Sequence, residues 1–352
     1  MLYEVIKMLK AAVLGATGNV GQIFIQLLNG HPWFKVSVVA ASERSTEKAY
    51  SRAAKWRQPT PMPAEVADLN VVPIEPNAVK DVDVVFSALP ADIAEKTEEN
   101  FAKAGYVILS NASAHRMEPD VPLLNPEINC DHVSLIEEQR KRRKWDGAIV
   151  TNPNCSTAVL TLALKPIYDK FGINKVAVST MQALSGAGYP GVPSLDIIDN
   201  VIPFIAKEEE KLENETLKIL GSPSKPADFK VSASCHRVAT LDGHLEAVFV
   251  ELKRMAEPES VIAAMENFVG EPQKLKLPTA PEKPVVVRRE EDRPQTRLDR
   301  MEGNGMSAVV GRVRKDPVFK GVKFVALGHN TIRGAAGCAI LNAEYLKAKK
   351  YI

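Results

Sequence analysis

The sequence predicts an α/β protein of two domains, in which a doubly wound parallel sheet is followed by an α/β domain built on a mixed sheet. Its 352 residues are more than an average domain with one hydrophobic core contains, so we expect two domains. From Lys10 to about Val150, short β-branched runs alternate with segments of helical periodicity, as in successive βαβ units. After Asn154, apolar and polar residues alternate along longer segments, which indicates a sheet with one solvated face.

Apolar runs in the first part of the chain have the length and composition of buried parallel strands. These runs are Ala11–Leu14, Val36–Ala40, Val82–Phe86, Tyr106–Leu109 and Ala148–Thr151. The segment Val20–Leu28 carries apolar residues at helical spacing and predicts a helix that connects the first two strands.

The second part of the chain predicts longer elements. Helices are expected at about Ser156–Phe171, Lys207–Leu220 and Thr331–Lys347, and strands at about Val176–Met181, Val231–Val238 and Leu245–Leu252. Lys274–Arg300 is rich in proline and charge, which predicts a surface excursion. The last helix is rich in glycine and alanine, so it can pack closely against the first domain. We therefore expect one domain of residues 1–151 with 330–352, and a second of residues 152–329.

Composition and charge exclude several classes of function. Lys plus Arg number 45 and Asp plus Glu 43, so no global charge favours nucleic acid or an anionic membrane. The basic run Arg140–Lys144 follows two glutamates and predicts a solvated helix end. Four cysteines stand far apart, so we expect neither a metal cluster nor a disulfide framework. Met1–Lys10 lacks the apolar core of a signal peptide, and these features together predict a cytoplasmic protein.

A glycine-rich turn follows the first predicted strand and precedes the first predicted helix. It reads Leu14-Gly15-Ala16-Thr17-Gly18-Asn19-Val20-Gly21, which is GxxGxxG and not the commoner GxGxxG. Such a turn directs backbone N–H groups and a helix N-terminus toward an anion. A tight turn without a ligand is the alternative. Because the turn opens a βαβ series, we favour a Rossmann-type dinucleotide site at Gly15, Thr17, Gly18, Asn19 and Val20.

The end of the second predicted strand bears on the type of dinucleotide. NAD sites usually place an acidic residue there, whereas this chain has Ser42, Arg44 and Ser45, which can donate to a 2′-phosphate. Glu43 weakens this argument because it adds a negative charge. The alternative is that Arg44 is only a charged loop residue without a ligand. We expect NADP in preference to NAD.

A candidate nucleophile lies where a predicted strand passes into a predicted helix. Cys155 follows Asn152-Pro153-Asn154 and precedes Ser156-Thr157, a polar context that suits a buried apolar cysteine poorly. A cysteine at a helix N-terminus is favoured as the thiolate, and the surrounding N–H groups can stabilise an oxyanion. His236 and His244 are candidate proton-transfer partners. His244 follows the turn signal Asp242-Gly243, so its side chain can reach a cleft.

These motifs together resemble one known family. The Asn152–Thr157 segment, Gln182, Arg237 and His244 are similar in order and spacing to the aspartate-semialdehyde dehydrogenases of archaea and fungi. The resemblance runs from the glycine turn to Gly328–Gly337, almost the whole chain.

The resemblance implies an NADP-dependent reductive dephosphorylation in lysine, threonine, methionine and isoleucine biosynthesis. Cys155 would attack β-aspartyl phosphate, phosphate would leave, and NADPH would reduce the thioester to aspartate β-semialdehyde. His244 would be the acid/base, Gln182 would orient the substrate, and Arg237 would bind the α-carboxylate.

The resemblance also implies further ligand contacts and an oligomer. Lys211 and Arg116 would hold phosphate, and Glu208 would meet the substrate ammonium; without the family, the helix bearing Glu208 and Lys211 is better explained as exposed and charged. Ser185, Gly186 and Asn330 would touch the nicotinamide half of the cofactor. A homodimer or homotetramer is expected, with a catalytic and dimerisation role for the second domain and no metal.

Two kinds of alternative remain open from the sequence. Malonyl-CoA reductase is similar over the full length and uses the same thiol chemistry with NADPH, whereas N-acetyl-glutamyl-phosphate reductase matches the motifs less well. The other alternative is a non-catalytic Rossmann protein that senses nucleotide ratio or bridges partners. Such a sensor needs the glycine turn but not Cys155, Gln182, Arg237 and His244 together.

Overall fold

The computed structural model describes residues 8–352, which divide into two compact units. Unit 1 holds residues 8–122, Val133–Thr151 and Ala339–Ile352, and unit 2 holds Leu123–His132 and Asn152–Cys338. The predicted division differs at two places, because residues 123–132 and 330–338 belong to unit 2. The expectation for Met1–Lys10 lies mostly outside the described residues. Within them, no helix is both long enough and apolar enough to span a membrane.

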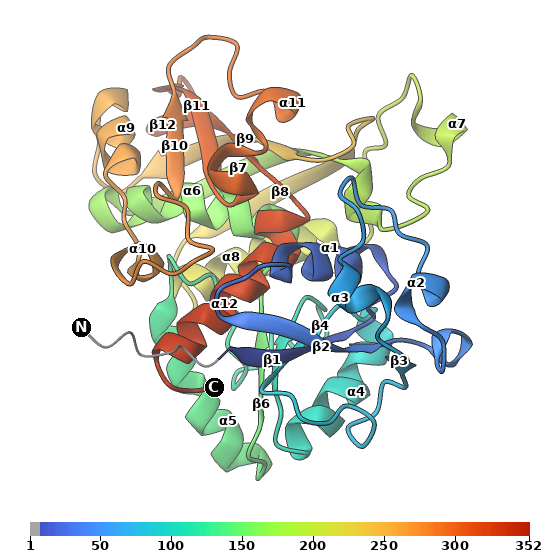
Figure 1. The fold of residues 1–352 in the computed structure, drawn as a ribbon. Coiled ribbons are helices and arrows are strands. Elements are labelled where there is room, and N and C mark those ends of the chain that lie inside the picture. The colour runs from blue at the N-terminus through green and yellow to red at the C-terminus, as the bar shows by residue number, and fades with distance from the viewer. Residues whose placement is uncertain (1–7) are drawn as a thin grey trace, which may run out of the picture. The chain divides into compact units, whose positions relative to one another are not determined.

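Unit 1 contains a six-stranded sheet in the order β3-β2-β1-β4-β5-β6, with every neighbouring pair parallel (Figure 1). The strands are β1 (Leu9–Leu14), β2 (Phe34–Ala40), β3 (Val71–Val72), β4 (Val84–Ser87), β5 (Val107–Ser110) and β6 (Ala148–Thr151). This order is that of a dinucleotide-binding fold, whose ligands bind at the carboxyl ends of strands where the order reverses. Here the reversal lies between β1 and β4.

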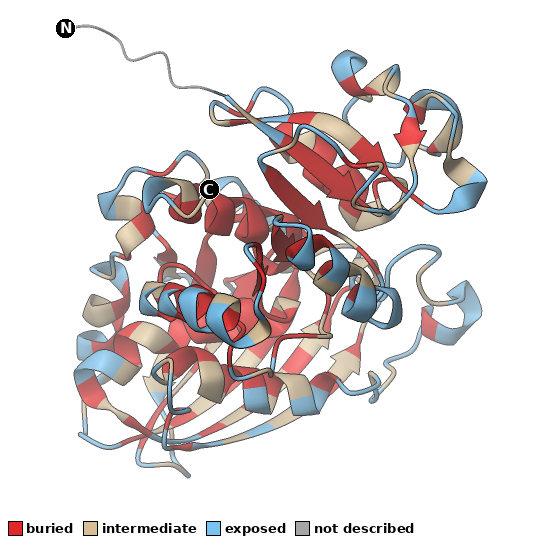
Figure 2. Ribbon diagram, turned by 90° about the horizontal axis from the view of Figure 1, so that it is seen from below, coloured by how far each residue is buried: buried red, intermediate tan, exposed pale blue. Residues whose placement is uncertain are grey.

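Helices cover the sheet of unit 1 and account for its buried strands. They are α1 (Asn19–Leu28), α2 (Tyr50–Ala53), α3 (Ala64–Ala67), α4 (Ala91–Lys103), α5 (Leu135–Arg143) and most of α12 (Gly337–Ala348). Strands β4, β5 and β6 are buried at every residue. Figure 2 colours buried residues red, and red predominates along the strands in the interior. The C-terminal helix is fixed by Glu344, whose carboxylate lies 2.7 Å from His31 Nε2.

Unit 2 is built on a mixed sheet in the order β10-β11-β12-β9-β7-β8. The strands are β7 (Ile173–Gln182), β8 (Lys230–Arg237), β9 (His244–Leu252), β10 (Val285–Arg288), β11 (Ala308–Lys315) and β12 (Gly321–Gly328). Pairs β7/β8 and β10/β11 are parallel, and the other three are antiparallel. Buried and partly exposed residues alternate along all of β9, so the sheet has one interior face, as predicted.

The helices of unit 2 are α6 (Cys155–Phe171), α7 (Ser194–Ile197), α8 (Glu208–Leu220), α9 (Pro258–Glu266), α10 (Glu271–Lys274) and α11 (Thr296–Asp299). Most of them pack on that interior face or around its edges, whereas the short α7 is largely exposed. Long apolar residues of α6, such as Leu160 and Leu164, join a core with Val248 and Val250 of β9. The core therefore holds α6, whose first residue is Cys155, against the strand that begins at His244.

The edge strand β8 is covered by α8 and by a backbone segment. Glu213 and Glu209 accept hydrogen bonds of 3.0 Å from the N–H groups of Ala233 and Cys235. The N–H of Arg237 donates to Ile202 O at 2.8 Å. These contacts satisfy alternate donors of an otherwise open edge and dock α8 beside the end of β8.

Two predictions about the second part of the chain were wrong. The supposed surface excursion Lys274–Arg300 contains β10, an edge strand parallel to β11. The predicted continuous helix Thr331–Lys347 is divided into a wide π-type turn, Ile332–Ala336, and α12. The division occurs at Ala335, whose φ of −151° is not helical.

Candidate active site

The turn between β1 and α1 needs glycine for close backbone approach. Gly15 has φ of +72°, and a Cβ there would lie 2.7 Å from Ala88 O at the end of β4. The Gly18 N–H donates to Gly15 O at 3.0 Å, which closes the turn. Among the described residues, no side chain caps the first N–H groups of α1, and its first turn, with Asn19 and Val20, is uncharged. These residues, with Thr17, fit the diphosphate of a dinucleotide.

The candidate 2′-phosphate residues lie just beyond β2. Ser42 precedes a short 3₁₀ turn, Glu43–Ser45, and Arg44 within it is exposed. Lys48 Nζ donates to Arg44 O at 2.8 Å, which places a second cation beside this turn. The donors fit a phosphate at this strand end, although Glu43 adds a negative charge among them.

Cys155 is the first residue of α6, one residue earlier than predicted. Asn154 caps the helix, since its Oδ1 accepts from the N–H groups of Ser156 and Thr157 at 3.0 and 3.2 Å. Asn154 is itself held by α8, because its N–H donates to Glu215 Oε2 at 2.6 Å and its Nδ2 to Glu208 Oε1 at 2.7 Å. The thiol is thus fixed at the positive end of a well-capped helix.

His244 faces the thiol directly. Its Nε2 lies 3.1 Å from Cys155 Sγ, and its Nδ1 accepts from the Ala183 N–H at 3.1 Å. This backbone donor assigns the ring proton to Nε2, so the imidazole presents an N–H to the sulfur. Burial, reinforced by the positive charge of Arg237 and by His329, lowers the pKa of His244 to about 3. The ring is therefore neutral at physiological pH.

Gln182 and Arg237 end the neighbouring strands β7 and β8 in the same register. Arg237 Nη1 donates to Ala183 O at 2.6 Å, and Gln182 Nε2 donates to Thr180 Oγ1 at 3.2 Å. Burial lowers the pKa of Arg237, against the opposing effect of the nearby Cys155. A Cβ on Gly186 would lie 3.0 Å from Arg237 Nη1 and 3.2 Å from His244 Cε1, so Gly186 covers both side chains.

The predicted substrate residues Glu208 and Lys211 share one face of α8. Lys211 Nζ lies 3.5 Å from Glu208 Oε2. Glu208 is 5% exposed, and its other carboxylate oxygen holds Asn154. The alternative of an exposed charged helix is therefore wrong for Glu208. Unit 2 brings Cys155, His244, Arg237 and Glu208 into one connected set of contacts.

Asn330 and Ser185 have a structural role that the sequence did not reveal. Asn330 Nδ2 donates to Ser185 Oγ at 2.8 Å, and Asn330 Oδ1 accepts from the Gly243 N–H at 2.8 Å. Asn330 therefore links the turn after β7 with the turn that precedes His244. The amide holds the site together whether or not it also touches a cofactor.

Arg116 lies in unit 1, on the segment that follows β5. Its Nη2 donates to Asn111 O at 2.7 Å, and the side chain is largely buried. The neighbouring His115 lies 2.9 Å from Glu118 Oε1 through Nδ1 and 3.9 Å from Glu98 Oε2 through Nε2. Burial raises the pKa of Glu98. This buried His115–Glu98 group beside Arg116 was not predicted from the sequence.

Two family models match the chain. The semialdehyde dehydrogenase NAD binding domain matches residues 10–136, and the semialdehyde dehydrogenase dimerisation domain matches residues 164–333. An aspartate-semialdehyde dehydrogenase from Methanothermobacter thermautotrophicus is 58% identical over 344 residues, covering 96% of this chain and 99% of the relative. One from Schizosaccharomyces pombe is 49% identical, covering 95% and 97%. The chain belongs to the semialdehyde dehydrogenase family.

Further comparisons agree with this membership. A protein named malonyl CoA reductase (NADP), from Metallosphaera sedula, is 44% identical and covers 98% of both chains. The crystal structure of aspartate semialdehyde dehydrogenase with NADP from Candida albicans matches with a TM-score of 0.91 at 42% identity. It covers 98% of this chain and 100% of its own. These comparisons confirm the family that the sequence resembles and the predicted fold class. They also confirm the prediction of an oxidoreductase that uses a nicotinamide dinucleotide.

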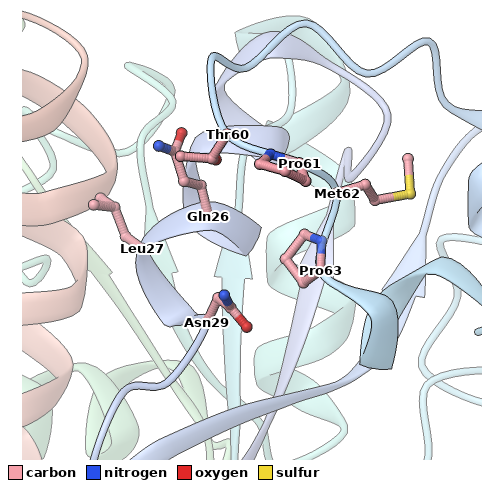
Figure 3. A pocket seen from close by; sticks show the side chains of 7 residues that line it. All are labelled: Gln26, Leu27, Asn29, Thr60, Pro61, Met62 and Pro63. Carbon is pink, nitrogen blue, oxygen red and sulfur yellow. The ribbon is translucent and has the colours of Figure 1, made fainter.

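A separate pocket of about 550 Å³ lies in unit 1 of this semialdehyde dehydrogenase (Figure 3). It is lined by Gln26, Leu27, Asn29, Thr60, Pro61, Met62 and Pro63. The described residues around it include no thiol, histidine or charged side chain. The cysteine, histidine and arginine described above do not line it, because they lie at the start of α6, the start of β9 and the end of β8.

Proposed function

We propose that this chain is an NADP-dependent aspartate-semialdehyde dehydrogenase that converts β-aspartyl phosphate and NADPH into aspartate β-semialdehyde, phosphate and NADP. The observation that carries the proposal is the 3.1 Å contact between Cys155 Sγ and His244 Nε2 at the N-terminus of α6. The names of the archaeal and fungal relatives support the substrate. The reaction belongs to the route toward lysine, threonine, methionine and isoleucine.

Cys155 is the nucleophile. Because His244 stays neutral, the thiol first loses its proton to solvent. The thiolate then attacks the acyl carbon, the C–O bond to phosphate breaks, and phosphate leaves with the bonding electrons. The thiolate is stabilised by the α6 N-terminus, by the Nε2–H of His244 and by the charge of Arg237. When bound, the NADPH supplies the hydride that reduces the resulting thioester to the aldehyde.

His244 works as a neutral hydrogen-bond donor in this proposal. Full proton transfer from the thiol would place a proton on both ring nitrogens, and the Nδ1 proton would then face the Ala183 N–H. That conflict, with burial, opposes the imidazolium. Once the sulfur is acylated, the Nε2–H is released from it and can donate to the acyl oxygen, which becomes negatively charged when hydride adds to the acyl carbon. This role differs from the acid/base role that the resemblance implies.

Each charged side chain binds a different charged group of the substrate in this proposal. Arg237 binds the α-carboxylate, Glu208 receives the ammonium, and Lys211 with Arg116 holds the phosphate. Gln182, at the end of β7, orients the acyl group. Glu208 already accepts from Asn154 and lies near Lys211, so it offers a fixed negative site that needs little reorganisation.

The cofactor assignment rests on the glycine turn, on the residues after β2 and on residues named from the family resemblance. Gly15, Thr17, Gly18, Asn19 and Val20 fit the diphosphate, and Ser42, Arg44 and Ser45 fit a 2′-phosphate, which favours NADP. Ser185, Gly186 and Asn330 are proposed to touch the nicotinamide half. Unit 1 is thus the NADP-binding domain, and unit 2 the catalytic and dimerisation domain of a homodimer or homotetramer.

Malonyl-CoA reduction is the second candidate, favoured by the 44% identical relative of that name. It would use the same thiol, but a CoA thiolate would leave in place of phosphate. It gives no role to an ammonium-binding carboxylate, whereas Glu208 is buried and oriented. This contrast favours the aspartyl substrate.

The test measures both activities on one preparation. We expect NADP reduction with aspartate semialdehyde that depends on added phosphate, and little NADPH oxidation with malonyl-CoA. Cys155→Ser should abolish turnover, and Cys130→Ser is the matched control at another partly exposed cysteine. Phosphate-independent turnover, or faster reaction with malonyl-CoA, would overturn the proposal.

A further inference from the structure

Arg333 is the largest fully buried side chain among residues 8–352. It lies in the π-type turn Ile332–Ala336 and forms two parallel bonds to one carboxylate, Nη1 to Glu127 Oε1 at 2.7 Å and Nη2 to Glu127 Oε2 at 2.8 Å. Nη2 also donates to Asn125 Oδ1. Nε has no hydrogen-bond partner among the described residues.

This ion pair is connected to the helix that carries Cys155. Asn125 Nδ2 donates to Ala158 O at 3.1 Å and to Thr161 Oγ1 at 3.2 Å, both in α6. The contacts therefore join three segments that are distant in sequence: the turn, residues 125–127 and the first turns of α6. They also explain why residues 123–132 and 330–338 belong to unit 2.

The turn held by Arg333 lies directly against the nucleophile's backbone. A Cβ on Gly334 would be 2.6 Å from Cys155 Cβ and 2.7 Å from its Cα, closer than real side chains approach. The Gly334 N–H donates to His329 O at 3.0 Å, which fixes the other side of the turn. A shift of this turn toward α6 would therefore displace Cys155.

A buried ion pair is a weak source of stability, because the desolvation of both charges offsets their attraction. Its bidentate geometry instead specifies one arrangement of the segments that it joins. Here the joined segments are the turn that borders Cys155 and the helix that begins with it. The hydrogen bonds of Arg333 within residues 8–352 go to Glu127 and Asn125, so the pair would act through Gly334 and α6.

We propose that Arg333 and Glu127 form a positioning pair, which holds the Ile332–Ala336 turn and α6 so that Cys155 keeps its contact with His244. The inference rests on the proposed thiol chemistry of Cys155. Loss of the pair relaxes the turn, lengthens the contact between Sγ and Nε2, and leaves substrate binding by Arg237 and Glu208 in place.

The test replaces both charges by apolar side chains of similar size, in Arg333→Met/Glu127→Leu. Removing both charges avoids leaving one buried and unpaired, so the melting temperature should stay near that of the wild type, whereas the single variant Arg333→Met should lose stability. Arg288→Met is the matched control. It breaks another arginine–carboxylate pair of unit 2, whose hydrogen bonds join Arg288 to Asp299 and Glu302 and not to α6.

Two readouts separate positioning from mere folding. For the folded double variant we expect kcat to fall about 10- to 100-fold with KM for aspartate semialdehyde changed less than threefold. We expect Cys155 alkylation by iodoacetamide at pH 7 to slow at least fivefold and to recover at alkaline pH. The control should keep both rates within twofold.

Two results would overturn the pair's positioning role. One is a folded double variant with wild-type kcat and alkylation rate, and the other is a loss of activity that only tracks the unfolded fraction. A wild-type protein without a fast-reacting Cys155 or phosphate-dependent turnover would instead contradict the proposed function itself. The two failures are therefore distinguishable.

Discussion

Glu246 lies two residues after His244 on β9 and faces the same interior side of the sheet. It is completely buried, and neither carboxyl oxygen has a hydrogen-bond partner among the described residues. Burial therefore raises its pKa well above the usual value. The fold must keep this acid protonated at a pH where the unfolded chain would ionise it.

Glu246→Gln removes the proton and keeps the shape of the side chain. A carboxyl whose pKa is raised by folding stabilises the fold at low pH, and that stability is lost as the pH rises above the unfolded value of about 4.3. While the folded group stays protonated, the loss is about 1.4 kcal/mol per pH unit, or about 3 kcal/mol from pH 5 to pH 7. The Glu246→Gln variant has no ionisable group at this position, so its free energy of unfolding should not show this decrease.

The assay is equilibrium urea unfolding at pH 5, 6 and 7 for the wild type, Glu246→Gln and the control Glu251→Gln. Glu251 is on the same strand but partly exposed, and it lies 3.1 Å from Lys175 Nζ. The Glu246→Gln variant should gain stability over the wild type as the pH rises, and the control should change by less than about 1 kcal/mol. A constant difference between Glu246→Gln and the wild type across this range would refute the reasoning.

Three further predictions concern the site. His244→Ala should lower kcat about 10²–10³-fold. His244→Gln keeps an N–H donor, so its kcat should be at least tenfold higher than that of His244→Ala. Equal kcat losses in steady-state assays would contradict the donor role. Because the pKa of His244 falls from about 6.5 unfolded to about 3 folded, stability should drop as pH falls between these values, and a stability profile flat over that range by thermal melts would contradict it. Gly15→Ala should weaken NADP binding at least tenfold in fluorescence titrations, whereas Gly30→Ala, with φ of +73° but open space around its Cβ position, should leave it unchanged; equal affinities would contradict a close approach at Gly15.

Local patterns were enough to predict several parts of this site. The sequence around Cys155 contains a cap and a strand-to-helix change, so the placement of the thiol at the start of α6 needed only neighbouring residues. The β1–α1 turn was predicted from its own glycine spacing between a strand and a helix, although the close approach of Gly15 to Ala88 O is a non-local contact. Alternation along Leu245–Leu252 correctly indicated a sheet with one interior face.

Non-local contacts could not be predicted in the same way. The tautomer and low pKa of His244 depend on the pairing of β9 with β7, which brings the Ala183 N–H to Nδ1. Strand β10 is four residues long within a charged, proline-rich segment, and its partner β11 begins twenty residues later. The break at Ile332–Ala336 follows from the burial of Arg333 against Glu127, more than two hundred residues away.

The central claim is that Cys155 forms a covalent acyl-enzyme beside a neutral His244. Intact-protein mass spectrometry tests it directly when the protein is mixed with aspartate semialdehyde and NADP in the absence of phosphate, so that the acyl group has no acceptor but water. We predict one aspartyl adduct per chain, located on the peptide with Cys155, removed by phosphate and absent from Cys155→Ser. An adduct on Cys130, Cys235 or Cys338, or turnover in Cys155→Ser, would contradict the account.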